Sequence, residues 1–188
     1  VVTAEPDAFL GIGTKSPMSS AELRASIETG TIENIINWKP VRAGEYYFIP
    51  AGTVHAIGGG VTIVEVQQNA DVTYRLYDYG RPRELHLEDG LAVASARPYE
   101  AKHCGAIDPN ADIQMLVDSE HFDLHYARDQ AILEFAKVSQ PVWIVPIEGR
   151  LTSLGEHFQA GDCAFFADCA ELEVEPGTIA LLARSKKL

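Results

Sequence analysis

Apolar residues in the stretch 44–81 fall into short runs separated by turn residues, which is the pattern of β-strands. The apolar run 46–49 ends at Pro50 and Gly52, which give a Pro-x-Gly turn signal. Three consecutive glycines, 58–60, permit a second sharp reversal, because residues without a Cβ atom tolerate positive φ. The pattern therefore predicts a hairpin built around a rigid corner.

The run 61–68, which follows the glycines, predicts a buried strand, because both faces of an extended chain would be largely apolar there. Glu65 lies on one of these faces, and a buried carboxylate needs a polar partner. His55 lies directly across the predicted hairpin and is the nearest candidate for that partner.

Helical signals precede this stretch. Ser19 and Glu22 form a capping-box pattern before an apolar stripe that stops at Gly30. Thr31 can cap a second short helix. A small helical pair is therefore predicted over residues 19–37.

Strand patterns dominate the rest of the chain. Residues 1–11 predict a strand end, a turn with proline and a new strand, and residues 41–79 predict one strand after another. Residues 86–94 instead have the apolar spacing of a helix. After residue 97 the expected strands are short and separated by glycine and proline, which favours an antiparallel sandwich or small barrel. These strands are 122–126, 131–138, 142–147, 163–166, 172–174 and 178–183.

A short internal repeat links the two halves of the chain. Residues 43–50 resemble residues 160–167, and the same alignment places Leu172 opposite His55. The repeat predicts two related β units, of which the second lacks the histidine.

Composition narrows the classes of function. The 188 residues are 46% hydrophobic with a mean hydropathy of −0.04, as in ordinary globular proteins, and no apolar run is long enough to span a bilayer. A net charge of −12 argues against nucleic-acid and membrane partners. The three cysteines lack metal-motif spacing, so we expect a reducing, cytoplasmic setting, with Cys163 and Cys169 as small buried apolar residues.

His55 is the strongest candidate for chemistry. The spacing Gly44-x5-Pro50-x-Gly52-x2-His55 matches the second motif of the cupin superfamily, in which the histidine is a metal ligand at the mouth of a small β-barrel. Gly59 stands where that motif usually has asparagine. The alternative for His55 is an ordinary hydrogen-bonded histidine. The other histidines are scattered and form no His-x-His pair: His86, His103, His121, His125 and His157.

Three charged residues follow His55. Glu65 can act as a base or a ligand, or can be a paired structural carboxylate. Arg75 and Arg81 lie among tyrosines. They can form a solvated strand edge, or they can bind an anion through the planar guanidinium fork, which fits phosphate.

The segments FIPAGTVHAIGGG and EVQQNADVTYRLYDYGRPRELHLE resemble the class I mannose-6-phosphate isomerases of the short bacterial type, which are cupins. A looser likeness extends over nearly all of the chain. The resemblance implies a mainly β, double cupin-like fold of two small antiparallel barrels or sandwiches, with a two-helix insert and an incomplete first barrel. Residues 1–97 would form the metal-site unit and residues 98–188 a degenerate second unit.

The same resemblance implies a zinc-dependent aldose–ketose isomerase that interconverts mannose 6-phosphate and fructose 6-phosphate through an enediol. His55 matches the zinc ligand, Arg75 the catalytic arginine and Glu65 an active-site carboxylate. Arg81 falls where relatives place a basic residue near the sugar phosphate.

The remaining zinc ligands of such enzymes, a Gln-x-His pair and a glutamate, would precede residue 1. We therefore expect the complete protein to carry them upstream, and a chain of these residues alone to isomerise nothing. Two alternatives are a non-catalytic sugar-binding or regulatory cupin and a structural β domain. The sequence leaves the oligomeric state open.

Overall fold

The computed structural model describes residues 1–69, 72–138 and 141–186, and the chain divides into two compact units. Unit 1 contains Val1–Glu65 and Asn69–Cys104, and unit 2 contains Val66–Gln68 and Gly105–Leu188. Strands predominate over helices, which confirms the mainly β prediction. The assignment of 1–97 as a metal-site unit and 98–188 as a degenerate unit stays a prediction.

Unit 1 is built on a three-stranded antiparallel sheet in the order β3-β2-β5, and a separate pair joins β1 to β6. Gly11, in the middle strand, is required by packing, because a Cβ atom there would lie 2.7 Å from Ile36 Cγ2. Leu10 and Ile12, on the other face of the strand, are buried in the core. The strands are β1 (Thr3–Ala4), β2 (Phe9–Thr14), β3 (Ile36–Pro40), β4 (Glu45–Tyr47), β5 (His55–Ile57) and β6 (Val61–Thr62).

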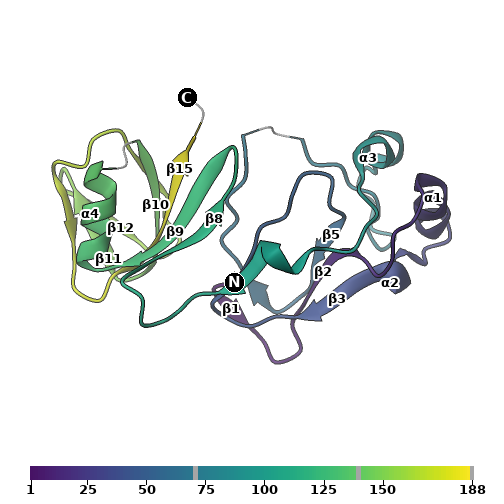
Figure 1. Ribbon diagram of the computed structural model, residues 1–188, viewed down its shortest axis with the longest axis horizontal. Helices are drawn as coiled ribbons and strands as arrows, with labels where there is room; N and C mark the ends of the chain where they lie inside the picture. Colours follow the sequence, from purple (N-terminus) through teal and green to yellow (C-terminus); the bar gives the residue numbers. More distant parts are fainter. Residues whose placement is uncertain (70–71, 139–140, 187–188) are drawn as a thin grey trace. The chain divides into compact units, whose positions relative to one another are not determined.

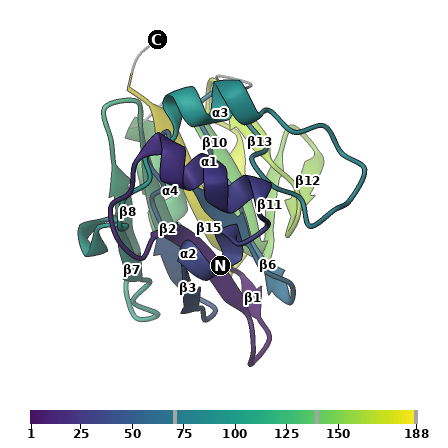
Figure 2. The ribbon, with the colours of Figure 1, turned by 90° about the vertical axis from the view of Figure 1, so that its right-hand side faces the viewer.

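The helices of unit 1 are α1 (Ser20–Glu28), α2 (Ile32–Ile35) and α3 (Leu87–Val93). The predicted capping box is present, since Glu22 N–H donates to Ser19 Oγ and Ser19 N–H donates to Glu22 Oε2. Figures 1 and 2 show α1 and α3 side by side, and Arg24 of α1 binds both carboxylate oxygens of Glu88 in α3. The predicted helical pair is therefore confirmed, as is the helix over 86–94.

The pair ends earlier than predicted, because residue 36 begins strand β3 instead of extending the helix to residue 37. The sheet explains the difference, since Ile36 is extended and pairs with Thr14 of β2.

The predicted strand 61–68 is wrong. Only Val61–Thr62 are in a strand, and β6 pairs with β1, whereas β5 pairs with β2. The glycine segment runs along β2 instead of reversing, because Gly58 N–H donates to the Phe9 carbonyl at 3.0 Å. Glu65 is consequently exposed and outside a strand, and the expected hairpin between it and His55 does not form.

Unit 2 packs a five-stranded antiparallel sheet, in the order β13-β10-β15-β9-β8, with a three-stranded sheet in the order β12-β11-β14. Its core contains fully buried Ile144, Leu151 and Leu182. The elements that follow the short strand β7 (Cys104–Ala106) are β8 (Ile113–Asp118), β9 (Phe122–Arg128), α4 (Gln130–Val138), β10 (Val142–Glu148), β11 (Arg150–Ser153), β12 (Glu156–Gln159), β13 (Ala164–Phe166), β14 (Leu172–Val174) and β15 (Ile179–Ser185).

The predicted strand 131–138 is also wrong, because these residues form helix α4 (Figure 1). Ile132 and Ala136, one helical turn apart, are both fully buried against the sheets, whereas Glu134 and Lys137 are exposed. The periodicity is thus close to 3.6 residues, not two. The other predicted strands of the second half are present, and β7, β8, β11 and β12 were not predicted.

Gly44 and Gly161, which the internal repeat aligns, both have positive φ, at 83° and 98°, and the relation of the two units stays a prediction. Leu172 is buried in the core of unit 2. Cys169 is fully buried as predicted, but Cys163 is exposed. The strand alternation explains this, because the buried residues of β13 are the first and third, so that the residue just before the strand points outward.

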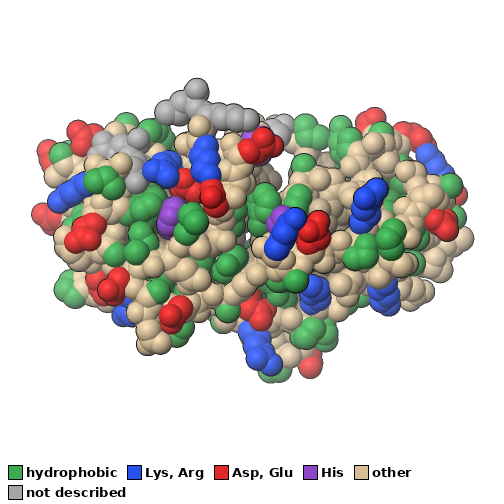
Figure 3. Space-filling view, viewed as in Figure 1, with side chains coloured by type: hydrophobic (Ala, Val, Ile, Leu, Met, Phe, Trp, Pro, Cys, Tyr) green, Lys and Arg blue, Asp and Glu red, His purple; other side chains and the backbone are tan. Residues whose placement is uncertain are grey.

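Charged side chains of both signs are interspersed over the face of the molecule shown in Figure 3. Each helix in the described part of the chain is too short or too polar to cross a lipid bilayer.

Candidate functional site

The turn before His55 is a type II turn. Thr53 N–H donates to the Pro50 carbonyl at 3.1 Å, and Gly52, at the third position, has a φ of 81°. The turn packs against the end of α3, where Ser95 N–H donates to the Gly52 carbonyl at 2.7 Å. A Cβ atom at Gly52 would lie 2.5 Å from a backbone oxygen, that of Val93, so glycine is required here for both conformation and space.

His55 is the first residue of β5 and lies opposite Ile12 of β2. Its ring is exposed, and Nδ1 lies 2.9 Å from the Thr53 carbonyl oxygen. When Nδ1 donates this hydrogen bond, Nε2 carries the lone pair, which is the usual arrangement of a metal-binding histidine. In the described ranges, no three side chains of His, Cys, Asp or Glu gather closely enough to hold a metal ion. The chain thus offers one imidazole donor at this turn, fitting one ligand position of a zinc site.

Arg75 lies on a loop that packs against α3. The adjacent Leu76 reaches so close to the helix that a Cβ atom at Gly90 would lie 2.5 Å from Leu76 Cδ2. Two hydrogen bonds join the Arg75 backbone to His86, and the guanidinium Nη1 donates to the Glu84 carbonyl at 3.3 Å. The glycine in α3 that weakens the helical pattern thus allows the arginine loop to dock.

Arg81 binds Asp78, with 2.8 Å between Nη2 and Oδ1. Arg83 donates to both carboxylate oxygens of the same aspartate through Nε and Nη2. The hydrogen bonds from Arg83, and then the positive charge of Arg81, lower the pKa of Asp78 although its burial opposes this. Asp78 is therefore a buried anion held between two arginines.

A tight turn creates this cluster. Arg81 N–H donates to the Asp78 carbonyl at 2.9 Å, and the two central residues, Tyr79 and Gly80, have φ values of 55° and 73°. Two positive φ values are the property of a type I′ turn. Sequence analysis missed Asp78 and Arg83, because tyrosine rarely adopts positive φ and the pattern around it resembles a strand. The Asp-x2-Arg-x-Arg spacing across a glycine was the available signal.

The structure brings only part of the predicted site together. Arg81 meets Asp78, and the positive charge of Arg75 also acts on that carboxylate. In the described part of the chain, no hydrogen bond or ion pair joins His55 or Glu65 to these arginines. Their roles as ligand and base stay predictions.

Two other features lie apart from these residues. A shallow cavity of about 370 Å³ is lined by Asp7, Phe9, Trp38, Gly58 and Gly59. Phe9 and Trp38 point to the face of the sheet opposite His55, because residues paired across an antiparallel sheet share a face and neighbours along a strand alternate.

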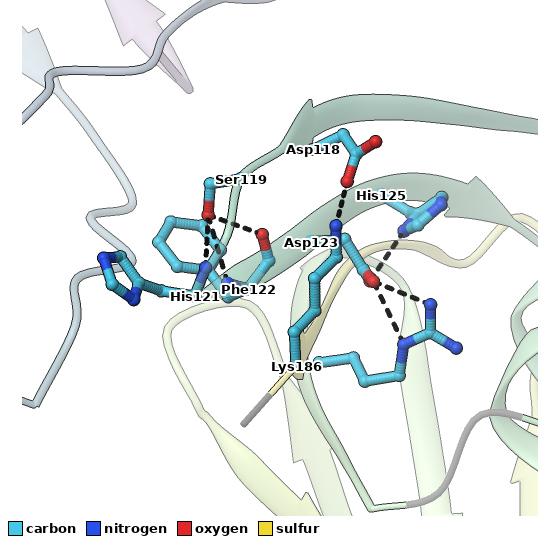
Figure 4. A network of polar contacts seen from close by, with 8 residues as sticks. Asp118, Ser119, His121, Phe122, Asp123, His125 and Lys186 are labelled. Carbon is cyan, nitrogen blue, oxygen red and sulfur yellow. Dashed lines mark hydrogen bonds and ion pairs between the residues drawn. The ribbon is translucent and has the colours of Figure 1, made fainter. Parts of the chain in front are cut away.

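The second feature is a polar cluster in unit 2 (Figure 4), where Asp123 on β9 is 2% exposed. Arg184 Nη2 lies 2.7 Å from Asp123 Oδ2, and His125 Nδ1 lies 3.5 Å from Oδ1. Burial, then the positive charge of Arg184, lowers the pKa of His125, and the negative charge of Asp123 raises it in part.

Both units are built on antiparallel β-sheets, and in unit 1 a turn-borne histidine precedes a short strand, as the sequence predicted. No protein-family model matches the chain. The chain is 34% identical over 162 residues to the mannose-6-phosphate isomerase of Streptococcus mutans, covering 81% of this chain and 51% of that protein. It is 31% identical over 175 residues to a mannose-6-phosphate isomerase of Bacillus subtilis, covering 86% of this chain and 55% of that protein.

The chain is thus a homologue of proteins named mannose-6-phosphate isomerase, which confirms the predicted resemblance, and it spans about half the length of these curated relatives. Among solved structures, the mannose 6-phosphate isomerase of Bacillus subtilis has a TM-score of 0.74 at 24% identity, over 98% of this chain and 62% of that one. A putative mannosephosphate isomerase of Archaeoglobus fulgidus has a TM-score of 0.61 at 13% identity, over 99% and 59%. These structures support the shared fold.

Proposed function

We propose that the protein acts as an aldose–ketose isomerase that interconverts mannose 6-phosphate and fructose 6-phosphate and depends on zinc. The supporting observation is the state of His55, whose Nδ1 faces a backbone carbonyl at 2.9 Å and whose Nε2 stays open at the end of a rigid turn. The names of the homologous proteins supply the reaction and the substrate class.

Zinc bound through Nε2 of His55 and further ligands outside the described residues would polarise the substrate's carbonyl or hydroxyl oxygen. Glu65, exposed on its loop, is the proposed base that removes a proton next to the carbonyl. Arg75 is proposed to stabilise the negative charge of the enediolate through its guanidinium. Arg81 is proposed to bind the phosphate, since its guanidinium is more than half exposed.

The proposed setting is the cytoplasm, because an odd number of cysteines without metal-motif spacing is typical of proteins in a reducing compartment.

The test uses the full-length protein with matched His55→Ala and His157→Ala variants, since His157 is an exposed histidine of unit 2. Isomerase activity with mannose 6-phosphate and zinc content by elemental analysis are measured together. We expect activity that a chelator removes and zinc restores, and a marked loss of zinc in His55→Ala alone. Full zinc content in His55→Ala would refute its role as a ligand. Sugar-phosphate binding without turnover in the wild type would favour the non-catalytic cupin instead.

A further inference from the structure

We propose that Asp78 is a positioning residue that holds Arg81 and Arg83 together as a two-guanidinium clamp for a phosphate group. The proposal adds Asp78 and Arg83 to the site and rests on the proposed function only for the carrier of that phosphate, a sugar.

A clamp requires a buried anchor and exposed arms, and the three side chains differ in burial in this way. Asp78 is 5% exposed, whereas the side chains of Arg81 and Arg83 are 58% and 48% exposed. The carboxylate therefore forms the buried base, from which the two guanidiniums extend to the solvent. A buried carboxylate needs such partners, because an uncompensated charge in the interior is strongly unfavourable.

Both arginines contact Asp78 through Nε and Nη2. Arg81 points Nη2 at the carboxylate and Nε at the backbone carbonyl of Asp78, and Arg83 points Nε and Nη2 at the carboxylate. Because the guanidinium is planar, this geometry turns Nη1 of each arginine away from Asp78. Each arginine therefore keeps N–H groups that Asp78 does not occupy, and such groups are the donors that bind phosphate in proteins.

The charge balance favours an anionic ligand. Two guanidiniums and one carboxylate leave a net positive charge, and Arg75 adds a further positive charge close enough to act on Asp78. The hydrogen bonds with Asp78 raise the pKa of Arg83, so its charge is fixed. The negative charge of Glu33 acts on Tyr79 of the same turn, but the contacts of Asp78 itself are with cations.

The geometry is also set before a ligand arrives. The turn with positive φ at Tyr79 and Gly80 fixes the separation of Asp78 and Arg81, and the Arg81 guanidinium lies 5.6 Å from the centre of the Tyr79 ring. Ordering two long side chains in the free protein reduces the entropy lost on binding.

The experiment measures the binding of inorganic phosphate to the full-length protein by calorimetry, together with the kinetics on mannose 6-phosphate. The variants are Asp78→Asn, Arg83→Gln and Arg83→Lys. Arg150→Gln is the matched control, because Arg150 is 47% exposed and paired with a carboxylate, that of Glu175, in unit 2. Thermal unfolding of each variant checks its folding.

We expect Arg83→Gln and Asp78→Asn to weaken phosphate binding by roughly tenfold or more, as for the loss of a charged hydrogen bond. Arg83→Lys should fall between Arg83→Gln and the wild type, and Arg150→Gln should match the wild type. In both Arg83→Gln and Asp78→Asn, KM for mannose 6-phosphate should rise while kcat stays near normal. A purely structural role of Asp78 would not affect KM alone. If Asp78→Asn fails to fold, the two Arg83 variants decide the matter.

Wild-type phosphate affinity in Arg83→Gln, or no phosphate binding by the wild type, would overturn the clamp. A protein that binds phosphate through these arginines but turns over no mannose 6-phosphate would keep the clamp and refute the isomerase. Isomerase activity that is unchanged in the Arg83 variants would support the isomerase and refute the clamp.

Discussion

His86 closes the loop that carries Arg75 through two hydrogen bonds to the backbone of that residue. The His86 N–H donates to the Arg75 carbonyl at 2.8 Å, and His86 Nδ1 accepts from the Arg75 N–H at 3.1 Å. Both arginines of the proposed phosphate clamp lie between these two residues. The loop is therefore closed by a side chain that the sequence presented only as one of several scattered histidines.

Replacing His86 with phenylalanine should loosen this loop. The side chain stays aromatic, but the Arg75 N–H loses its acceptor, which should lower the free energy of unfolding by about 1 kcal/mol. Urea unfolding measures the loss, with His157→Phe as the control, because the His157 ring is exposed and its hydrogen bond with the Thr152 hydroxyl, at 3.0 Å, lies at the surface. An unfolding free energy of His86→Phe equal to that of the wild type would show that the side-chain bond contributes nothing to loop closure.

Local signals predicted the parts of the fold that local interactions determine. The capping box at Ser19 and Glu22 began a helix where expected, because its hydrogen bonds join residues three positions apart. The run 131–138 was assigned wrongly, because a short apolar segment fits both a strand and a helix until burial is known. Ile132 and Ala136 are buried together only because two sheets lie beneath that helix.

In the candidate site, the turn before His55 was predicted correctly, because Gly52 has the positive φ that the Pro-x-Gly signal implies. The role of His55 stays a prediction. Asp78 was missed, because its burial between two arginines depends on a tyrosine in a conformation that tyrosine rarely adopts. Sequence patterns report preferred conformations, so a feature built on an unfavourable one has to be seen in the structure.

Gly52 and Gly44 provide a test of why glycine is needed in the turn before His55. Their φ values are 81° and 83°, so a Cβ atom strains both backbones equally. At Gly44 there is nothing within 4 Å, whereas at Gly52 the Val93 oxygen would be 2.5 Å away. Gly44→Ala should cost about 1 kcal/mol of stability. Gly52→Ala should cost about 1–3 kcal/mol more, from overpacking. Thermal and urea unfolding compare the two, and similar losses would mean that the turn moves away from α3 freely.

Acidification should destabilise unit 2 through His125. Burial and the charge of Arg184 hold its pKa below the ordinary value of 6.5, although Asp123 opposes this. The unfolded chain therefore binds the proton more readily, and the stabilisation is complete above about pH 6.5 and is lost as pH falls towards the folded-state pKa. One proton can change the free energy of unfolding by at most about 1.4 kcal/mol per pH unit.

Urea unfolding between pH 7 and pH 5, with an NMR titration of the histidine rings, checks this expectation. The variant His125→Gln should remove its part of the slope, while the carboxylates Asp118 and Asp123 and the cations Arg184 and Lys186 remain as in the wild type. A His125 pKa above 6.5, or stability that rises as the pH falls, would contradict the prediction.

The division of work between Arg75 and Arg81 is the sharpest test of the proposed reaction. Arg75 is proposed to act on an enediolate that exists only along the reaction path, so Arg75→Ala should lower kcat and kcat/KM together, by roughly 2–4 kcal/mol. Arg81 is proposed to hold a phosphate that is present from binding to release, so Arg81→Ala should chiefly raise KM. Steady-state kinetics of the two variants in the full-length protein separate these effects. An Arg75→Ala enzyme with near-normal kcat and a greatly raised KM would show that Arg75 binds the substrate and that the charge of the enediolate is stabilised elsewhere.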